Sequence, residues 1–280
     1  MKQKLIADSG STKTDWRLTG GTGSGVSFQS RGMNPFFRSA GDLYEELNDL
    51  FPSSMRDQVG EIHYYGAGMV QGKDKPVRDA LSLLFPGAVI EIRSDILGAA
   101  RALFGNCPGI ACIMGTGSNA CFYDGREITA RVPPLGFILG DECSGSDLGK
   151  KLLGDYFKGI MPERVSKLFE KRYQPVQLEV LDRVYRKEQT NRYLAGYAPF
   201  LASLPDDPYC RGTVTGRFRE FMDRNVMQIP EVSGQPIGFA GSVAWHFREI
   251  ILPLCASYGF TEPVLLKNPV DNLAAFHTKV

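Results

Sequence analysis

A cluster of residues that could bind a phosphate and a metal ion lies near the start of the chain, in the segment LIADSGSTKTDW at positions 5–16. Glycine lets a backbone turn tightly, so that successive N–H groups and hydroxyls converge on an anion, and a lysine adds positive charge. A carboxylate at the end of the preceding strand, here Asp8, could hold Mg²⁺, mostly through water. An ordinary hairpin turn is the structural alternative. The predicted phosphate-binding residues are Gly10, Ser11, Thr12, Lys13 and Thr14.

A second turn of the same kind, Gly115-Thr116-Gly117-Ser118-Asn119, follows another apolar run. Its letters match the dinucleotide fingerprint GxGxxA, but that fingerprint must open a helix. Here the following segment, ACFYDG, is typical of a strand that leads into a hairpin, and the chain contains no GxxxxGK[ST] motif. We therefore interpret the two turns as a pair of loops on either side of a cleft, which together hold the phosphates of a nucleotide.

Three further motifs could supply groups for catalysis and for substrate binding. Asp95 stands between a strand and a helix, where it could take a proton from a substrate hydroxyl or serve as the helix cap. The acidic, glycine-rich segment 140–146, which includes Asp141, suits a hydroxylated substrate or the start of a helix. Gly241 and Ser242 would let an adenine ring lie against the backbone, or would let a helix pack closely on a strand.

Strands alternate with helices along the chain, which predicts the α/β class. The pattern of strand, small-residue turn and hairpin that opens the sequence starts again after Pro108, so the chain is interpreted as two diverged copies of one unit. We predict one domain over residues 1–108 and a second over 109–280. The second domain is expected to contain a helical insertion at about 145–225, and its last helix could pack back on the first domain.

Composition excludes several classes of function. The 32 Lys and Arg residues nearly balance the 31 Asp and Glu residues and form no basic stripe, which excludes a nucleic-acid partner. The six cysteines show no CxxC pair and no metal-ligand spacing, as expected in a reducing compartment. No apolar stretch has the length of a signal peptide or a membrane span. We therefore expect a cytoplasmic protein without a membrane partner.

Four motifs in order, DSGSTKT, MGTGSNA, LGDECSGSDLG and GFAGSVAW, resemble the BadF/BadG/BcrA/BcrD ATPase superfamily. Within that superfamily they resemble the N-acetylglucosamine kinases of the actin-like, sugar-kinase fold, and the resemblance extends over almost the whole chain. It implies two ribonuclease-H-like domains flanking a cleft, which close over a sugar and ATP with Mg²⁺, commonly in a homodimer. The implied reaction is phosphorylation of the 6-hydroxyl of an amino sugar, with N-acetylglucosamine as the first expectation.

The resemblance also implies roles for individual residues. Asp95 matches the aspartate that deprotonates the sugar hydroxyl, and Asp8 matches the residue that positions Mg²⁺. The sugar-binding positions of the family correspond to Asn34 and Asp141. Its nucleotide-binding positions correspond to Thr12 and Thr116 at the phosphates, and to Gly196, Gly241 and Ser242 at the adenosine.

The sequence departs from the animal relatives just before the GDE motif. Those relatives have a Gly- and Trp-containing stretch that touches the sugar, where this chain has VPPLG at 132–136. Leu135 and Gly136 would then form a sugar pocket of different shape, so N-acetylmuramate or another sugar stays open as the substrate. Two functions of another class also stay open: an ATPase activator, which would hold an iron–sulfur cluster through cysteines, and a nucleotide-binding sensor without sugar transfer.

Overall fold

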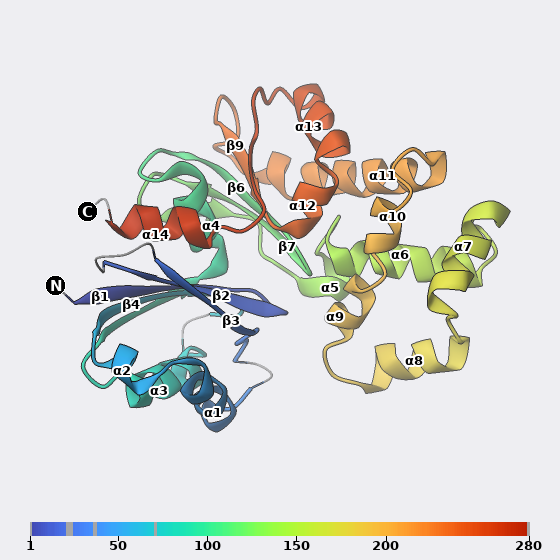
Figure 1. Cartoon of the computed structure of the whole chain (residues 1–280). Helices are drawn as coiled ribbons and strands as arrows, with labels where there is room; N and C mark the ends of the chain where they lie inside the picture. Colours follow the sequence, from blue (N-terminus) through green and yellow to red (C-terminus); the bar gives the residue numbers. More distant parts are fainter. Residues whose placement is uncertain (1, 21–24, 36–37, 70–71, 279–280) are drawn as a thin grey trace. The chain divides into compact units, whose positions relative to one another are not determined.

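The computed structural model of the chain describes residues 2–20, 25–35, 38–69 and 72–278 (Figure 1). The glycine-rich segment GTGSG at residues 21–25, which its composition predicts to be a turn, lies almost wholly outside the described residues. The chain divides into two compact units, of which the first comprises Met1–Ala111, Tyr123–Thr129 and Asn268–Val280, and the second Cys112–Phe122 and Ala130–Lys267. No described helix has both the length and the apolar character needed to cross a membrane.

The first unit is built on a five-stranded sheet of order β3-β2-β1-β4-β5. β1 (Gln3–Ser9), β2 (Lys13–Thr19) and β3 (Val26–Arg31) form an antiparallel meander, whereas β4 (Val59–Gly66) and β5 (Val89–Ser94) continue the sheet parallel to β1. The apolar run of β1 is fully buried because this strand is central. Its polar carboxyl end therefore emerges at the edge of the sheet where parallel strands deliver functional groups.

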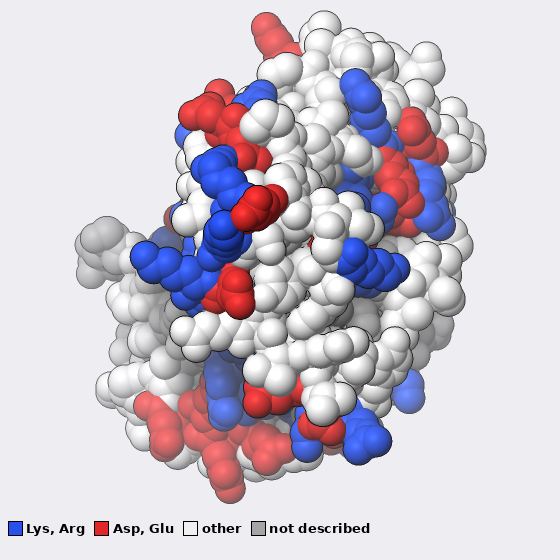
Figure 2. Space-filling model, turned by 90° about the vertical axis from the view of Figure 1, so that its right-hand side faces the viewer, with Lys and Arg blue, Asp and Glu red and all other residues white. Residues whose placement is uncertain are grey.

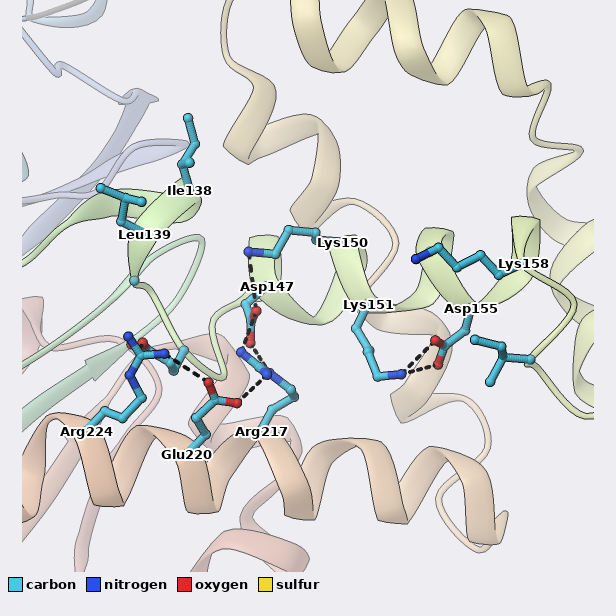
Figure 3. A pocket seen from close by; sticks show the side chains of 14 residues that line it. Ile138, Leu139, Asp147, Lys150, Lys151, Asp155, Lys158, Arg217, Glu220 and Arg224 are labelled. Carbon is cyan, nitrogen blue, oxygen red and sulfur yellow. Dashed lines mark hydrogen bonds and ion pairs between the residues drawn. The ribbon is translucent and has the colours of Figure 1, made fainter.

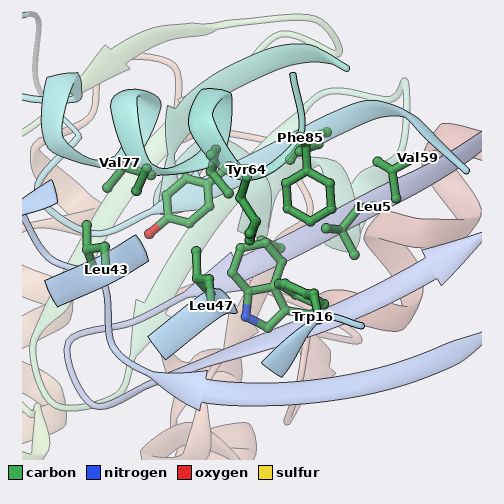
Figure 4. Packing of buried hydrophobic residues seen from close by; sticks show 14 of the residues in the cluster. Leu5, Trp16, Leu43, Leu47, Val59, Tyr64, Val77 and Phe85 are labelled. Carbon is green, nitrogen blue, oxygen red and sulfur yellow. The ribbon is translucent and has the colours of Figure 1, made fainter. Parts of the chain in front are cut away.

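Helices cover one face of this sheet with a continuous apolar core (Figure 4). They are α1 (Ala40–Leu50), α2 (Ser53–Arg56) and α3 (Lys75–Leu84). In the core, the Trp16 ring from β2 meets Phe51 edge-on, with ring centroids 5.2 Å apart. Burial of this cluster fixes the strands whose ends supply the candidate site.

The other face is covered by α4 (Asp95–Phe104) and α14 (Val270–Thr278), which contact each other. A buried histidine fastens α14 to the sheet: His277 Nε2 lies 2.8 Å from the hydroxyl oxygen of Tyr65. That oxygen also accepts a hydrogen bond from Arg101 Nη1 at 2.7 Å. The Tyr65 hydroxyl, which can both accept and donate, therefore links Arg101 on α4 to His277 on α14.

The second sheet has the order β10-β9-β6-β7-β8. Its strands are β6 (Gly109–Met114), β7 (Ser118–Tyr123), β8 (Ile128–Arg131), β9 (Ile237–Ala240) and β10 (Val264–Leu266). β6 is central in this sheet, with β7 and β8 on one side and β9 and β10 on the other. In the same way β1 is central in the first sheet, with β2 and β3 on one side and β4 and β5 on the other. The two mixed sheets with flanking helices confirm the predicted α/β fold of two similar halves.

Most helices of the second unit lie between β8 and β9. In chain order they are α5 (Gly136–Leu139), α6 (Gly145–Phe157), α7 (Glu163–Tyr173), α8 (Gln177–Arg186), α9 (Thr190–Ala195), α10 (Pro199–Ala202), α11 (Pro208–Arg224) and the 3₁₀ turn η1 (Val226–Gln228). α12 (Ser242–His246) and α13 (Arg248–Ser257) follow β9. α6 can lie close to α9 because Gly149 has no Cβ. A Cβ there would clash with the Leu194 carbonyl oxygen.

We predict that acid weakens the first unit through His277. Burial, followed by the charges of His63 and Arg101, lowers the pKa of His277 to about 4, and the His63 ring stacks on it at 3.7 Å between centroids. Because this value lies below the usual 6.5 of an unfolded chain, stability is lost as pH falls from about 6.5 towards 4, by about 3 kcal/mol in all.

Urea unfolding at several pH values, with His277→Gln as the matched variant, measures this effect. Glutamine can still accept from Tyr65 but does not titrate, so the wild type should lose stability relative to the variant only below about pH 6.5. Comparison with the variant cancels the carboxylates that titrate in the same range. A stability difference that stays constant with pH would contradict the prediction.

Candidate active site

Two carboxylates lie at the carboxyl edge of the first sheet, close enough for their charges to interact. Asp8 ends the buried run of β1, and Asp95 begins α4 directly after β5. Burial, followed by the charges of Asp95 and Asp15, raises the pKa of Asp8 to about 7, although Lys13 acts in the opposite direction. Burial is the main cause of the shift and the two neighbouring carboxylates add to it, so a cation bound beside Asp8 would favour its charged form.

The donor set suits Mg²⁺. Carboxylate oxygens are hard ligands, and Mg²⁺ is usually bound by one or two of them, with waters and substrate phosphates completing the octahedron. Within the described part of the chain, no group of three or more His, Cys, Asp or Glu residues could hold a metal by itself. A cation bound at Asp8 would thus take most of its ligands from water and substrate.

The interpretation of Asp95 as the cap of α4 is wrong, because Ser94 occupies that position. The Ser94 side chain accepts from the Leu97 amide at 3.4 Å, while Asp95 Oδ1 accepts from the Ile96 amide at 2.8 Å. Asp95 is therefore the first residue inside the helix, and its side chain is oriented by the bond from the Ile96 amide. A carboxylate held in this way is suited to act as a base.

The turn that follows β1 is closed by a hydrogen bond from the Gly10 amide to the Lys13 carbonyl, at 2.9 Å. Two of its hydroxyls hold the turn together: Ser9 Oγ and Thr14 Oγ1 are 2.7 Å apart, and Thr14 also donates to the Arg31 carbonyl at 3.1 Å. Thr14 is fully buried. Among the five residues predicted to bind ATP here, the other four are at least partly exposed and Thr14 is the one that faces the interior.

Asn34 is brought to the same turn by the segment after β3. The Gly32 amide donates to the Thr12 carbonyl at 3.0 Å, and a Cβ at Gly32 would lie only 2.5 Å from the Ser11 carbonyl oxygen. Only glycine allows this approach, which places the partly buried Asn34 two residues further on.

Lys13 Nζ lies 2.6 Å from the Asp15 carboxylate and 3.3 Å from Asn268 Oδ1, so its charge is partly balanced.

In the second unit, the loop with Asp141 is locked onto the second glycine turn. The Ser118 amide donates to Asp141 Oδ1 at 3.2 Å, and the Gly145 amide donates to the Gly115 carbonyl at 2.8 Å. β7 begins at Ser118, which confirms that this turn does not open a helix. A Cβ at Gly117 would lie 2.9 Å from the Asp141 carboxylate, so glycine there lets this carboxylate lie against the turn.

Asp141 has an unusual backbone and an unusual pKa. Its φ of 56° lies in the left-handed region, where a residue other than glycine needs support from its surroundings. Burial raises its pKa to about 6; the Ser118 amide opposes this shift, and the charges of Glu142 and Asp147 add to it. Such support and such a shift are typical of a carboxylate kept for function.

The remaining predicted nucleotide residues gather around the same turn. Gly241 has a φ of 123°, and a Cβ there would lie 2.4 Å from the Met114 carbonyl oxygen, so this position requires glycine. Ser242 begins α12 directly after it. Gly196 ends α9, and the neighbouring Ala195 approaches Gly145, where a Cβ would be 3.0 Å away.

The stretch predicted to shape the sugar pocket leads into α5. Leu135 precedes the helix with 57% of its surface exposed, and Gly136 opens it with a φ of 71°. Leu135 lies close to Gly140: a Cβ at Gly140 would be 3.4 Å from the Leu135 Cβ. Both residues therefore belong to the same surface loop as Asp141.

The ion pair between Asp147 and Arg217, which supports the loop that contains Asp141, could not be predicted from the sequence (Figure 3). Asp147 is 1% exposed and accepts from Arg217 Nε at 2.6 Å and from Nη2 at 2.9 Å. It also accepts from the Cys143 amide at 2.9 Å. Asp147 and Arg217 line one side of a cavity of about 580 Å³ between α6 and α11. The helical pattern revealed no sign of this pairing, because Arg217 is 70 residues away in sequence.

Comparison with known proteins gave no matching family model and no matching curated protein. Among solved structures, a candidate N-acetylglucosamine kinase from Porphyromonas gingivalis is 39% identical, with a TM-score of 0.92 over 100% of this chain and 99% of that one. A candidate N-acetylglucosamine kinase from Chromobacterium violaceum is 14% identical, with a TM-score of 0.74 over 99% of both chains. A ROK-family glucokinase from Streptomyces griseus, solved with glucose and AMPPNP, is 14% identical, with a TM-score of 0.55 over 99% of this chain and 100% of that one. The last two share the fold.

Proposed function

Because the chain belongs to the N-acetylglucosamine kinase-like family of the actin-like, sugar-kinase fold, we propose that it phosphorylates the 6-hydroxyl of an amino sugar with ATP, and that N-acetylglucosamine is its sugar. The observation that carries the proposal is that Asp8 and Asp95 lie at the same edge of the first sheet, close enough for their charges to interact. Asp8 would bind the metal ion and Asp95 would act as the base. Phosphoryl transfer needs these two groups, together with donors that align and neutralise the phosphates.

In the proposed reaction, Asp95 takes the proton of the sugar 6-hydroxyl as its oxygen bonds to the γ-phosphorus. The bond from that phosphorus to the bridging oxygen of ADP breaks, and Asp95 afterwards releases the proton to water. When Mg²⁺ is bound at Asp8, it neutralises charge on the transferring phosphates. Backbone and hydroxyl donors of the two glycine turns, at Thr12 and Thr116, would bind the phosphates, and Gly241 would border the adenosine.

For the sugar, we propose Asn34 and Asp141 as hydrogen-bonding residues. Leu135 and Gly136 would shape the pocket around the substituent at carbon 2 of the sugar. Their stretch differs from that of the animal relatives, so N-acetylmuramate is the second candidate substrate. We also propose that the protein acts in the cytoplasm, where its six free cysteines would stay reduced, and that it is a homodimer.

The activator of a radical dehydratase is disfavoured by the positions of the cysteines. A [4Fe–4S] cluster shared by two subunits takes four thiolates, hence two accessible cysteines from each chain. Five of the six cysteines are buried, and Cys107 alone is exposed. A nucleotide-binding sensor would release no sugar phosphate, so product analysis distinguishes it from a kinase.

The test is ADP release from MgATP with N-acetylglucosamine, N-acetylmuramic acid, N-acetylmannosamine, glucosamine and glucose, with mass detection of the sugar phosphate. One strongly preferred acetamido sugar would support the proposal. ADP release that no sugar stimulates, with MgATP bound normally, would overturn the kinase assignment in favour of the sensor.

We predict that Asp8→Asn weakens binding of MgATP by about tenfold or more, because a neutral amide is a poor ligand for Mg²⁺. Binding of ATP in EDTA should change little, and this comparison isolates the metal. The fold should be unharmed, because the substitution removes a charge that Asp95 repels. Calorimetric titration with and without Mg²⁺ measures both affinities. Equal losses under the two conditions would show that Asp8 acts on something other than the cation.

A further inference from the structure

α8 presents a stripe of large apolar side chains to solvent. Leu178 is 78% exposed, Leu181 43% and Tyr185 79%, and their spacing of three and four residues puts them on one face of the helix. Val180, on the opposite face, is 6% exposed and holds α8 against the protein. Singly exposed apolar residues are common, but a contiguous stripe along a helix indicates a contact surface.

The stripe lies on the side of the second unit formed by α7 and α8 (Figure 1). Figure 2 looks onto that side of the molecule, where Lys and Arg, in blue, and Asp and Glu, in red, lie among other residues, in white. Val176, which precedes α8, adds a further apolar side chain that is 51% exposed.

The charges of α8 are ordered along its length. Both acidic residues, Glu179 and Asp182, precede both basic residues, Arg183 and Arg186. At 100° per residue all four lie along the same border of the apolar stripe. Acidic residues early and basic residues late also suit the helix dipole, but the dipole does not account for an apolar stripe beside them.

We propose that α8 is the surface through which two copies of this chain pair, with the two helices antiparallel about a two-fold axis near Leu181. A two-fold axis perpendicular to the two helices reverses their direction and places the same border of both helices together. The acidic half of each helix then faces the basic half of the other. Leu178 packs on the partner's Tyr185, and Glu179 lies beside the partner's Arg186.

A second copy fits this charge order better than an unrelated partner of one charge. A uniformly basic or acidic surface would attract one half of α8 and repel the other, whereas a reversed copy matches both halves. A ten-residue helix makes a smaller contact than a standard interface. We therefore expect reversible dimers in the micromolar range. The inference assigns a surface to the proposed homodimer and does not depend on the kinase reaction.

Sedimentation velocity from roughly 1 to 100 µM tests the surface by charge reversal. Glu179→Arg and Arg186→Glu should each raise the dissociation constant at least about tenfold, because each places like charges together across the axis. The double variant should restore dimerisation, which a merely damaged fold would not do. A wild type that stays monomeric, or a dimer that ignores both single variants, overturns the proposal.

Cross-linking tests the antiparallel arrangement in a Cys107→Ser background. Leu181→Cys lies at the axis, so oxidised glutathione should link it to itself. Leu178→Cys alone should link poorly, whereas a mixture of Leu178→Cys and Tyr185→Cys chains should link well. The reverse pattern, in which Leu178→Cys links to itself and the mixture does not, would show parallel or unrelated pairing and overturn the proposal.

Discussion

Asp95→Asn is expected to lower the rate of sugar phosphorylation by about 10²–10⁴-fold, the usual contribution of a positioned general base. Asparagine keeps the size of the side chain and still offers an oxygen to the Ile96 amide, which Asp95 Oδ1 contacts at 2.8 Å. It cannot accept a proton from the sugar hydroxyl. The start of α4 should stay intact, because Ser94 supplies the cap.

The expected loss should appear in kcat and leave the affinity for MgATP nearly unchanged. Asp95 is proposed to touch the acceptor hydroxyl, and removing an interaction that develops in the transition state lowers kcat with little effect on ground-state binding. Single-turnover phosphorylation and calorimetric titration with MgATP separate these quantities. Full turnover by Asp95→Asn would disprove its role as the base.

Asp141→Asn provides the matched comparison, because it also exchanges a carboxylate for an amide. Asp141 is proposed to bind the sugar without taking a proton from it, so its loss should raise the KM for the sugar more than it lowers kcat. If both variants lose kcat equally, the division of roles between the two aspartates is wrong.

Much of the fold could be predicted from the sequence because its signals are local. The apolar run of β1, the glycine turn after it and the restart of the pattern at β6 each occupy a few consecutive residues. Repetition then indicated that the second sheet would copy the first, and the strand orders agree. The turns at Gly10 and Gly115 were also visible, because glycine is placed where the backbone must bend tightly.

The roles of individual side chains within those motifs were less visible. Thr14 and Thr12 are the same residue type in the same motif. Thr14 nevertheless points to the buried face of β2, where its hydroxyl is hydrogen-bonded to that of Ser9. Ser94 and Asp95 are both good capping residues, and only the backbone at the strand end decides between them. Residue type predicts a polar turn, whereas the direction of each side chain follows from register.

The individual side-chain pairs that join distant segments could not be predicted from the sequence. His277 meets Tyr65 across 212 positions, and Arg217 meets Asp147 across 70. A single sequence shows each partner as an ordinary residue of an amphipathic helix or strand. Such pairs depend on how helices pack, and packing is decided by the summed burial of many residues.

Arg217→Met is expected to lower the free energy of unfolding by about 3 kcal/mol. The substitution leaves the Asp147 carboxylate, which is 1% exposed, without its bidentate partner. Breaking a buried ion pair from one side typically costs about 3–5 kcal/mol. The lower end applies because Lys150 Nζ, 3.7 Å from Asp147, and the Cys143 amide still face the carboxylate.

Arg219→Met is the matched control on the same helix. Arg219 is exposed and has no ion pair within the described part of the chain, so its replacement should change stability by less than about 0.5 kcal/mol. Chemical unfolding of both variants, followed by circular dichroism, measures the difference. Equal effects would mean that the pair between Arg217 and Asp147 contributes nothing beyond an exposed arginine.

Adding Asp147→Asn to Arg217→Met separates charge from packing. If the cost arises from an unpaired buried charge, the double variant should regain most of the stability, because an amide can still accept from the Cys143 amide without a counter-ion. If it arises from the lost arginine stem, the second substitution should restore nothing. Asp147 also holds the loop that contains Asp141, through the Cys143 amide. Arg217→Met should therefore raise the KM for sugar as well, and the double variant should restore both this KM and the stability. Recovery of stability without recovery of KM would mean that the ion pair supports the helices and leaves the position of Asp141 to its bond with Ser118.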